Sequence, residues 1–166
     1  MKAAKVYLVG FMAAGKTTLA RALAKRLDWA AADIDDLIET REHITVAEIF
    51  ARHGEPYFRA VERAVLADQL HPRHVVVATG GGTFVDPSNR AAINADGVSI
   101  WLDAPLDRVI ARLPVNGRRP LTADRSEFEH LYHQRRAAYQ QAHWRLDAGR
   151  ASVDSLVEQV VDWLDG

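Results

Sequence analysis

One segment near the N-terminus, Gly10–Thr17 with the sequence GFMAAGKT, constrains the fold of this chain more than any other. An apolar run over residues 5–9 precedes it and is typical of a short buried strand. Leucines at helical spacing follow it over residues 18–27. A strand, a glycine loop and a helix N-terminus in this order are the context of a phosphate-binding P-loop. The segment therefore predicts a nucleotide-binding α/β protein.

The physical basis of this prediction is the start of the helix. Its first N–H groups have no intrahelical partner and carry partial positive charge, so they can hold a phosphate. Gly10 and Gly15 let the backbone turn tightly and approach the ligand. Lys16 can place a charge on the terminal phosphates, and the Thr17 hydroxyl can bind Mg²⁺. The alternative is a plain glycine turn with an incidental lysine, but the flanking pattern favours binding.

Length and composition limit the class of protein. The 166 residues are 48% hydrophobic and 26% charged, which predicts one globular domain over residues 1–166. A net charge of −1 gives no electrostatic footprint for nucleic acid or an anionic membrane. The lack of cysteine excludes disulfides and thiolate chemistry. No apolar run reaches the ~20 residues of a membrane span, and no signal peptide precedes the first strand, so we expect a cytoplasmic protein.

Strand and helix patterns alternate along the whole chain. Strands are expected at 5–9, 30–36, 75–79, 98–102 and 145–147. Helices are expected at 18–27, 36–41, 45–54, 56–70, 86–95, 105–112, 125–143 and from 152 onward. This alternation predicts a parallel sheet covered by helices on both faces, a three-layer α/β/α fold. The segment at about 113–124 breaks the pattern with prolines and arginines and is a candidate lid.

Two acids and a glycine run are the candidate groups at the ends of the predicted strands. Asp33 and Asp35, two apart on a strand, would share one face and could serve Mg²⁺ and an accepting hydroxyl. The alternative is that acids here cap the next helix, which fits Asp36 better. The run Gly80–Gly82 could let a ligand lie on backbone N–H groups, or could simply be a flexible turn.

Taken together and in order, these motifs resemble the shikimate kinases, a family of P-loop small-molecule kinases similar to nucleoside monophosphate kinases. The motifs are GFMxAGKTT at 10–18, DxD at 33–35, Ile49-Phe50, Gly54-Glu55, FRxxE at 58–62, ATGGG at 78–82, RPL at 119–121, and Arg135 four residues before Tyr139. The resemblance implies a five-stranded parallel sheet with a P-loop core at about 5–27, a substrate-binding region at about 33–62 and a lid at about 113–124.

The resemblance also implies how the substrate is held. Shikimate, the expected acceptor of the ATP γ-phosphoryl group at its 3-hydroxyl, carries one carboxylate, and arginines are well suited to bind it. The arginines that match the family's carboxylate-binding pair are Arg59 and Arg135, the latter chosen over Arg136. Asp35 matches the acid that contacts the hydroxyls and accepts a proton. The remaining implied substrate contacts are Gly80, Gly81, Gly82, Phe50 and Phe58.

On the nucleotide side, the resemblance implies ATP as co-substrate and Mg²⁺ as cofactor, with Thr17 and Asp33 at the metal. Arg119 matches a lid arginine over the transferring phosphoryl group and acts with Lys16 and Asp35 in catalysis, and Arg112 matches an arginine that stacks on adenine. The implied nucleotide contacts are Ala13, Ala14, Gly15, Lys16, Thr17, Thr18, Arg112, Arg119 and, in the turn at 148–152, Arg150. Ala13 departs from the family, which usually has glycine there.

Two other classes of function compete with this prediction. A related kinase for a sugar acid or a nucleotide would share the P-loop and the sheet. A nucleotide-dependent switch or binding protein is a different class, but a guanine-specifying NKxD segment is absent and the catalytic acids are present. The family suggests a monomer, and the net charge of −1 leads us to expect no nucleic-acid or membrane partner.

Overall fold

The computed structural model describes residues 1–112 and 125–166. Within these ranges, five strands form one all-parallel sheet in the order β2-β3-β1-β4-β5. The strands are β1 Lys5–Val9, β2 Ala30–Asp33, β3 Val75–Ala78, β4 Val98–Asp103 and β5 Trp144–Asp147. The predicted α/β class and parallel sheet are confirmed.

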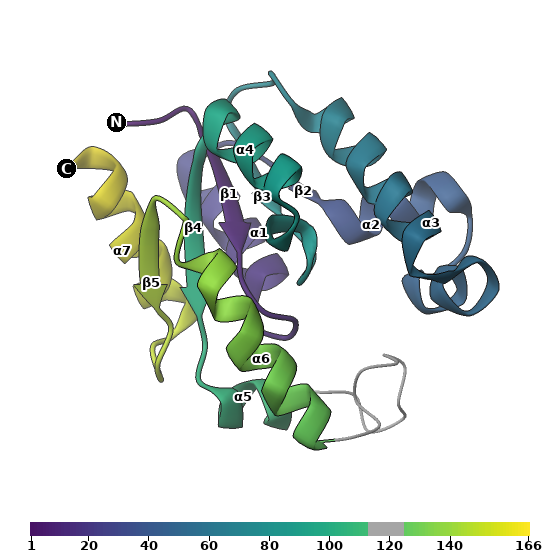
Figure 1. Cartoon of the computed structure of the whole chain (residues 1–166). Helices are drawn as coiled ribbons and strands as arrows, with labels where there is room; N and C mark the ends of the chain where they lie inside the picture. The colour runs from purple at the N-terminus through teal and green to yellow at the C-terminus, as the bar shows by residue number, and fades with distance from the viewer. Residues whose placement is uncertain (113–124) are drawn as a thin grey trace.

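Helices cover both faces of this sheet. They are α1 Lys16–Leu27, α2 Ile34–Glu42, α3 Val46–Gln69, α4 Pro87–Asp96, α5 Leu106–Ala111, α6 Arg125–Tyr139 and α7 Val153–Asp165, with a short 3₁₀ helix η1 at Thr83–Val85. Figure 1 shows α4 and α6 on the near side of the sheet, and α1, which packs against β3 and α7, on the far side. The α2–α3 pair packs together beyond the β2 edge (Figure 1).

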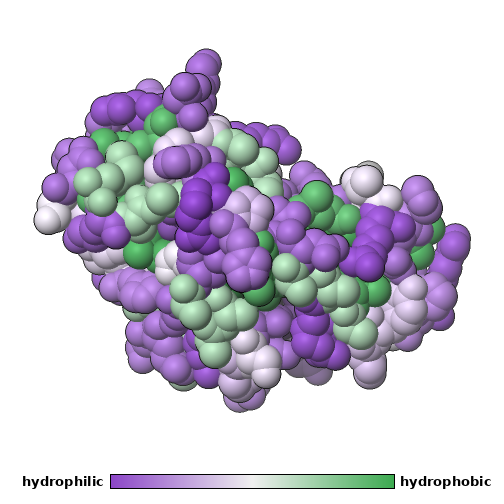
Figure 2. Space-filling view, turned by 90° about the horizontal axis from the view of Figure 1, so that it is seen from above, coloured by the Kyte–Doolittle hydropathy of each residue, from purple (hydrophilic) through white to green (hydrophobic). Residues whose placement is uncertain are grey.

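The core lies around β1, the central strand. All five of its residues are buried, because neighbouring strands flank it on both sides and helices cover both faces. This central position explains the continuous apolar run in the sequence. Seen from above, the hydrophobic residues in view are interspersed with hydrophilic ones (Figure 2). No helix among the described residues is long and apolar enough to span a membrane.

Several predicted helix boundaries are confirmed by their caps. Thr45 and Glu48 form a capping box at the start of α3, and Asp86 accepts backbone N–H bonds at the start of α4. Gly54, with φ 81° and ψ 173°, interrupts α3 where a break between two helices was expected. The helix expected to reach residue 143 ends earlier, at Tyr139, because the chain tightens into turns before β5.

The prediction that Asp33 and Asp35 share the face of one strand is wrong. The Asp33 side chain accepts a hydrogen bond from the Asp36 N–H at 3.1 Å and thereby caps α2, which begins at Ile34. Asp35 consequently lies in the first turn of a helix. In the alternative interpretation, in which an acid caps the next helix, the capping residue is Asp33 and not Asp36.

Candidate active site

The P-loop connects β1 to α1 at the carboxyl edge of the sheet. Gly10 has φ 146°, and a Cβ there would lie 2.7 Å from the Leu102 carbonyl oxygen, so the turn out of β1 admits only glycine. Gly15, with φ 103°, is the N-cap of α1. The loop therefore brings the positive end of α1 next to the carboxyl ends of the strands, where ligands bind in open parallel sheets.

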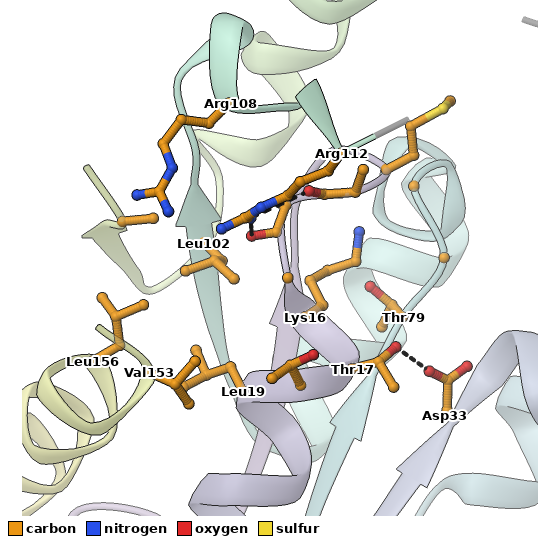
Figure 3. Close-up of a pocket in the computed structure, with 18 of the residues that line it drawn as sticks. Lys16, Thr17, Leu19, Asp33, Thr79, Leu102, Arg108, Arg112, Val153 and Leu156 are labelled. Carbon is orange, nitrogen blue, oxygen red and sulfur yellow. Dashed lines mark hydrogen bonds between the residues drawn. The ribbon is translucent and has the colours of Figure 1, made fainter. Parts of the chain in front are cut away.

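A cavity of about 420 Å³ opens over this loop (Figure 3). Its lining includes Asp35, Gly80 and Gly81, and also Arg108, Arg112 and Leu156. Most of the predicted nucleotide contacts line it, namely Ala13, Ala14, Gly15, Lys16, Thr17, Thr18 and Arg112. Its volume lies in the usual range of sites for small molecules.

The other two predicted nucleotide contacts are Arg119 and Arg150. Arg119 lies outside the described residues. Arg150 is exposed in the turn after β5 and does not line the cavity, although Ala148 and Ala151 on either side of it do. Arg108, which sequence reasoning missed, lines the cavity from α5 and donates a hydrogen bond to the Gly149 carbonyl oxygen.

The Lys16 side chain folds over the P-loop. Its Nζ donates hydrogen bonds to the carbonyl oxygens of Gly10 at 2.5 Å and Phe11 at 2.9 Å, and the residue is only 8% exposed. These contacts hold the ammonium group above the loop that would receive phosphates. A buried cation at this position can neutralise developing negative charge on a phosphoryl group.

Thr17 and Asp33 meet beside the loop. The Thr17 hydroxyl donates a hydrogen bond to Asp33 Oδ2 at 2.5 Å (Figure 3). A hydroxyl and a carboxylate side by side at a phosphate site fit Mg²⁺, which takes oxygen ligands and is commonly held by one or two protein groups together with substrate phosphates. These two residues would hold the metal.

The glycine run is where the predicted acceptor contacts converge. A Cβ added to Gly80 would lie 2.8 Å from Asp35 Oδ1. One added to Gly81 would lie 3.3 Å from Arg135 Nη1, and one added to Gly82 would lie 2.5 Å from Arg59 Nη2. Side chains from α2, α3 and α6 thus pack directly on the bare backbone at the end of β3. A side chain at Gly80 or Gly82 would displace the Asp35 carboxylate or the Arg59 guanidinium from its present place, and one at Gly81 would be in tight contact with the Met12 backbone nitrogen at 3.2 Å.

Glu62, to which sequence reasoning gave no role, holds Arg59 in this arrangement. It is 1% exposed, and its oxygens accept hydrogen bonds from Arg59 Nη1 at 3.0 and 3.2 Å. It also accepts a bond from the Thr83 hydroxyl at 2.8 Å, and that hydroxyl accepts the Gly80 N–H at 2.9 Å. A buried carboxylate paired in this way fixes the guanidinium direction. The i,i+3 spacing on one helix was the available signal.

Aromatic rings form the wall next to Arg59. Phe50 and Phe58 stack with ring centroids 4.7 Å apart, and the Arg59 guanidinium lies over the Phe58 ring at 5.2 Å. Tyr139, buried in α6, donates its hydroxyl to the Gly81 carbonyl oxygen. Burial raises the pKa of the Tyr139 hydroxyl, so the group stays protonated as a donor.

The neighbouring arginines of α6 point to different surroundings. Arg135 lies at Gly81 and over the Phe11 ring, whereas Arg136 pairs with Asp103 at 2.7 Å and stacks near Trp101. The hydrogen bond to Asp103 raises the pKa of the Arg136 guanidinium. Only Arg135 of the two contacts the glycine run in the described structure.

A P-loop at the carboxyl edge of a five-stranded parallel sheet, with one acid and two arginines gathered at the glycine run beside it, is typical of a small-molecule kinase. Residues 12–165 match the family model described as shikimate kinase. A shikimate kinase of Geobacter metallireducens is 37% identical over 97% of this chain and 92% of its own. The chain belongs to the shikimate kinase family.

Solved structures agree with this assignment. A shikimate kinase from Acinetobacter baumannii in complex with shikimate superimposes with a TM-score of 0.91 at 30% identity, covering 96% of this chain and 92% of its own. Deoxyadenosine kinase from M. mycoides with bound dATP has a TM-score of 0.67 at 15% identity, covering 98% of this chain and 100% of its own. The second likeness is one of fold alone.

Proposed function

We propose that this protein transfers the γ-phosphoryl group of ATP to the 3-hydroxyl of shikimate, giving shikimate 3-phosphate and ADP. The main support is the glycine run, where Asp35, Arg135 and Arg59 each lie against a different glycine in the neighbourhood of the P-loop. One acid and two guanidinium groups match a ligand with hydroxyls and one carboxylate. Relatives that bear the name shikimate kinase and the shikimate complex support the same acceptor.

In the proposed reaction, the shikimate 3-hydroxyl oxygen bonds to the γ-phosphorus while the bond from that phosphorus to the β–γ bridging oxygen breaks. The hydroxyl proton passes to Asp35, and ADP leaves. Arg59 and Arg135 hold the carboxylate so that the hydroxyl lies in line with the breaking bond. Lys16 and the N–H groups at the start of α1 counter the charge on the phosphoryl oxygens.

The proposal includes Mg²⁺, held by Thr17 and Asp33, which supplies further positive charge at the phosphates. We also propose that the protein works as a monomer in the cytoplasm, where ATP is available.

A coupled assay of ADP release tests the proposal. Shikimate, a sugar acid and a nucleoside monophosphate are each supplied with ATP and Mg²⁺, and NMR locates the phosphate on the product. We expect ADP release only with shikimate, with phosphorylation at the 3-hydroxyl. Faster release with either other acceptor, or a product phosphorylated elsewhere, would refute it.

A further inference from the structure

The P-loop contains one residue whose backbone conformation is unfavourable for its type. Ala13 has φ 59°, in the left-handed region. The other described non-glycine residues with positive φ are an aspartate and three histidines, Asp28, His43, His71 and His74, which belong to the residue types enriched in that region. Alanine has no side-chain group that could stabilise it there. Contacts with residues elsewhere in the molecule must therefore stabilise the left-handed conformation of Ala13.

Arg112, at the end of α5, is placed to do so. Its Nη1 donates hydrogen bonds to the Ala14 carbonyl oxygen at 3.0 Å and to the Ala13 carbonyl oxygen at 3.4 Å (Figure 3). The same Nη1 would lie 3.4 Å from a Cβ on Gly15, so the guanidinium lies against three successive residues of the loop. The direction of the Ala13 carbonyl is set by the backbone angles of Ala13, so a donor at this point favours the left-handed form.

We propose that Arg112 is a positioning residue of the P-loop, which holds Ala13 in its left-handed conformation and so keeps the loop in the form that binds phosphates. This inference rests on the proposed use of the loop as the phosphate site. It differs from an adenine contact because it acts through the loop backbone and does not require a base. It also accounts for how this chain tolerates alanine at position 13.

A double-mutant cycle between Arg112→Ala and Ala13→Gly tests the inference. The probe is inorganic tripolyphosphate with Mg²⁺, which has no base, and calorimetry gives its dissociation constant for the four proteins. Glycine adopts positive φ without penalty, so in the Ala13→Gly protein the hydrogen bonds from Arg112 are no longer needed to hold the loop conformation. We expect the loss of affinity caused by Arg112→Ala to be at least about fivefold smaller in the Ala13→Gly background, since the left-handed penalty of alanine corresponds to about a five- to thirtyfold population change.

A matched control is Arg108→Ala. Arg108 lines the same cavity from the same helix but donates to the Gly149 carbonyl and not to the loop, so its effect should be equal in both backgrounds. Thermal unfolding of each variant shows whether the fold is kept. Arg112→Lys keeps the positive charge, so it separates loss of the guanidinium hydrogen bonds from loss of charge. Equal losses for Arg112→Ala in both backgrounds, or an unchanged tripolyphosphate affinity, would overturn the inference. Either result is independent of whether shikimate is the acceptor.

Discussion

Asp35 occupies the point where the acceptor pocket meets the phosphate site. It stands in the first turn of α2, with Oδ1 2.8 Å from where a Cβ of Gly80 would be. We predict that Asp35→Asn leaves ATP binding near normal and lowers kcat about 10²- to 10⁴-fold, because an amide cannot accept the hydroxyl proton. Calorimetry with ATP and the coupled ADP assay measure the two effects.

Asp36→Asn is the matched control for this variant. Asp36 is the next residue along the chain, and its side chain is 60% exposed, so the substitution removes the same charge outside the pocket. Its turnover should stay close to that of the unchanged protein. A similar fall in both variants would mean that Asp35 acts through general electrostatics and not as the proton acceptor.

Glu62 positions Arg59 without facing the cavity itself. We predict that Glu62→Gln raises the KM for shikimate about tenfold or more while changing the KM for ATP little, because the amide keeps one acceptor oxygen but lacks the negative charge that pairs with the Arg59 guanidinium. Steady-state kinetics with each substrate varied in turn gives both constants. Glu55→Gln is the control, since Glu55 contacts the same arginine at 3.4 Å from an exposed position. Equal KM changes for both variants would contradict the role of Glu62.

At the scale of elements, the break in α3 shapes the aromatic wall. Phe50 precedes Gly54 and Phe58 follows it, yet the two rings stack at 4.7 Å. We predict that Gly54→Ala lowers the free energy of unfolding by about 1–3 kcal/mol, because φ 81° with ψ 173° lies in a region that is essentially restricted to glycine. Urea unfolding measures this change. A stability equal to that of the unchanged protein would show that the kink is not held at positive φ.

Local signals in the sequence were enough to place most elements. The capping box at Thr45, the Asp86-Pro87 pair and the apolar run of β1 each act within a few residues, so their consequences are readable without tertiary information. The α2 boundary was misjudged because Asp33, Asp35 and Asp36 can all cap a helix in principle. Which one does so depends on where β2 stops pairing with β3, a contact distant in sequence.

The contacts that support the site could not be predicted from the sequence either, because they also join residues that are far apart along the chain. Glu62 bonds to Thr83, and Tyr139 to the Gly81 carbonyl, across separations of 21 and 58 residues. Such pairs form only when α3 and α6 pack against the end of β3. The left-handed conformation of Ala13 likewise depends on the arrangement of the loop in three dimensions. Residue types and motif spacing were enough to predict the residues that contact the ligands. They were not enough to predict the residues that position those contacts.

At the scale of the whole molecule, a buried charge network joins the amino ends of the strands, opposite the site. Lys5, fully buried at the start of β1, pairs with Asp96 at 2.7 Å, and the Tyr7 hydroxyl donates to the same carboxylate at 2.6 Å. Burial alone would raise the pKa of Asp96, but bonds from Lys5, Tyr7 and the His71 N–H outweigh it and hold that pKa below its ordinary value.

A depressed carboxylate pKa stabilises the fold above the unfolded pKa of about 4, and this stabilisation is lost as pH falls toward the folded pKa. We predict that Asp96→Asn lowers the free energy of unfolding by about 3 kcal/mol at neutral pH, since it leaves Lys5 buried without its counter-ion. The difference between the two proteins should shrink at about pH 3. Urea unfolding at both pH values checks this, and a difference that grows on acidification would contradict it.

Everything proposed for the pocket depends on the shikimate carboxylate lying against Arg59 and Arg135 beside the P-loop. Calorimetric titration with shikimate and with its methyl ester, which keeps the hydroxyls but lacks the charge, tests this most directly. We expect the ester to bind the unchanged protein at least about tenfold more weakly than shikimate, and this difference to be smaller for Arg59→Ala, in which Arg135 alone is left to pair with the carboxylate. An ester that binds the unchanged protein as tightly as shikimate would contradict the account.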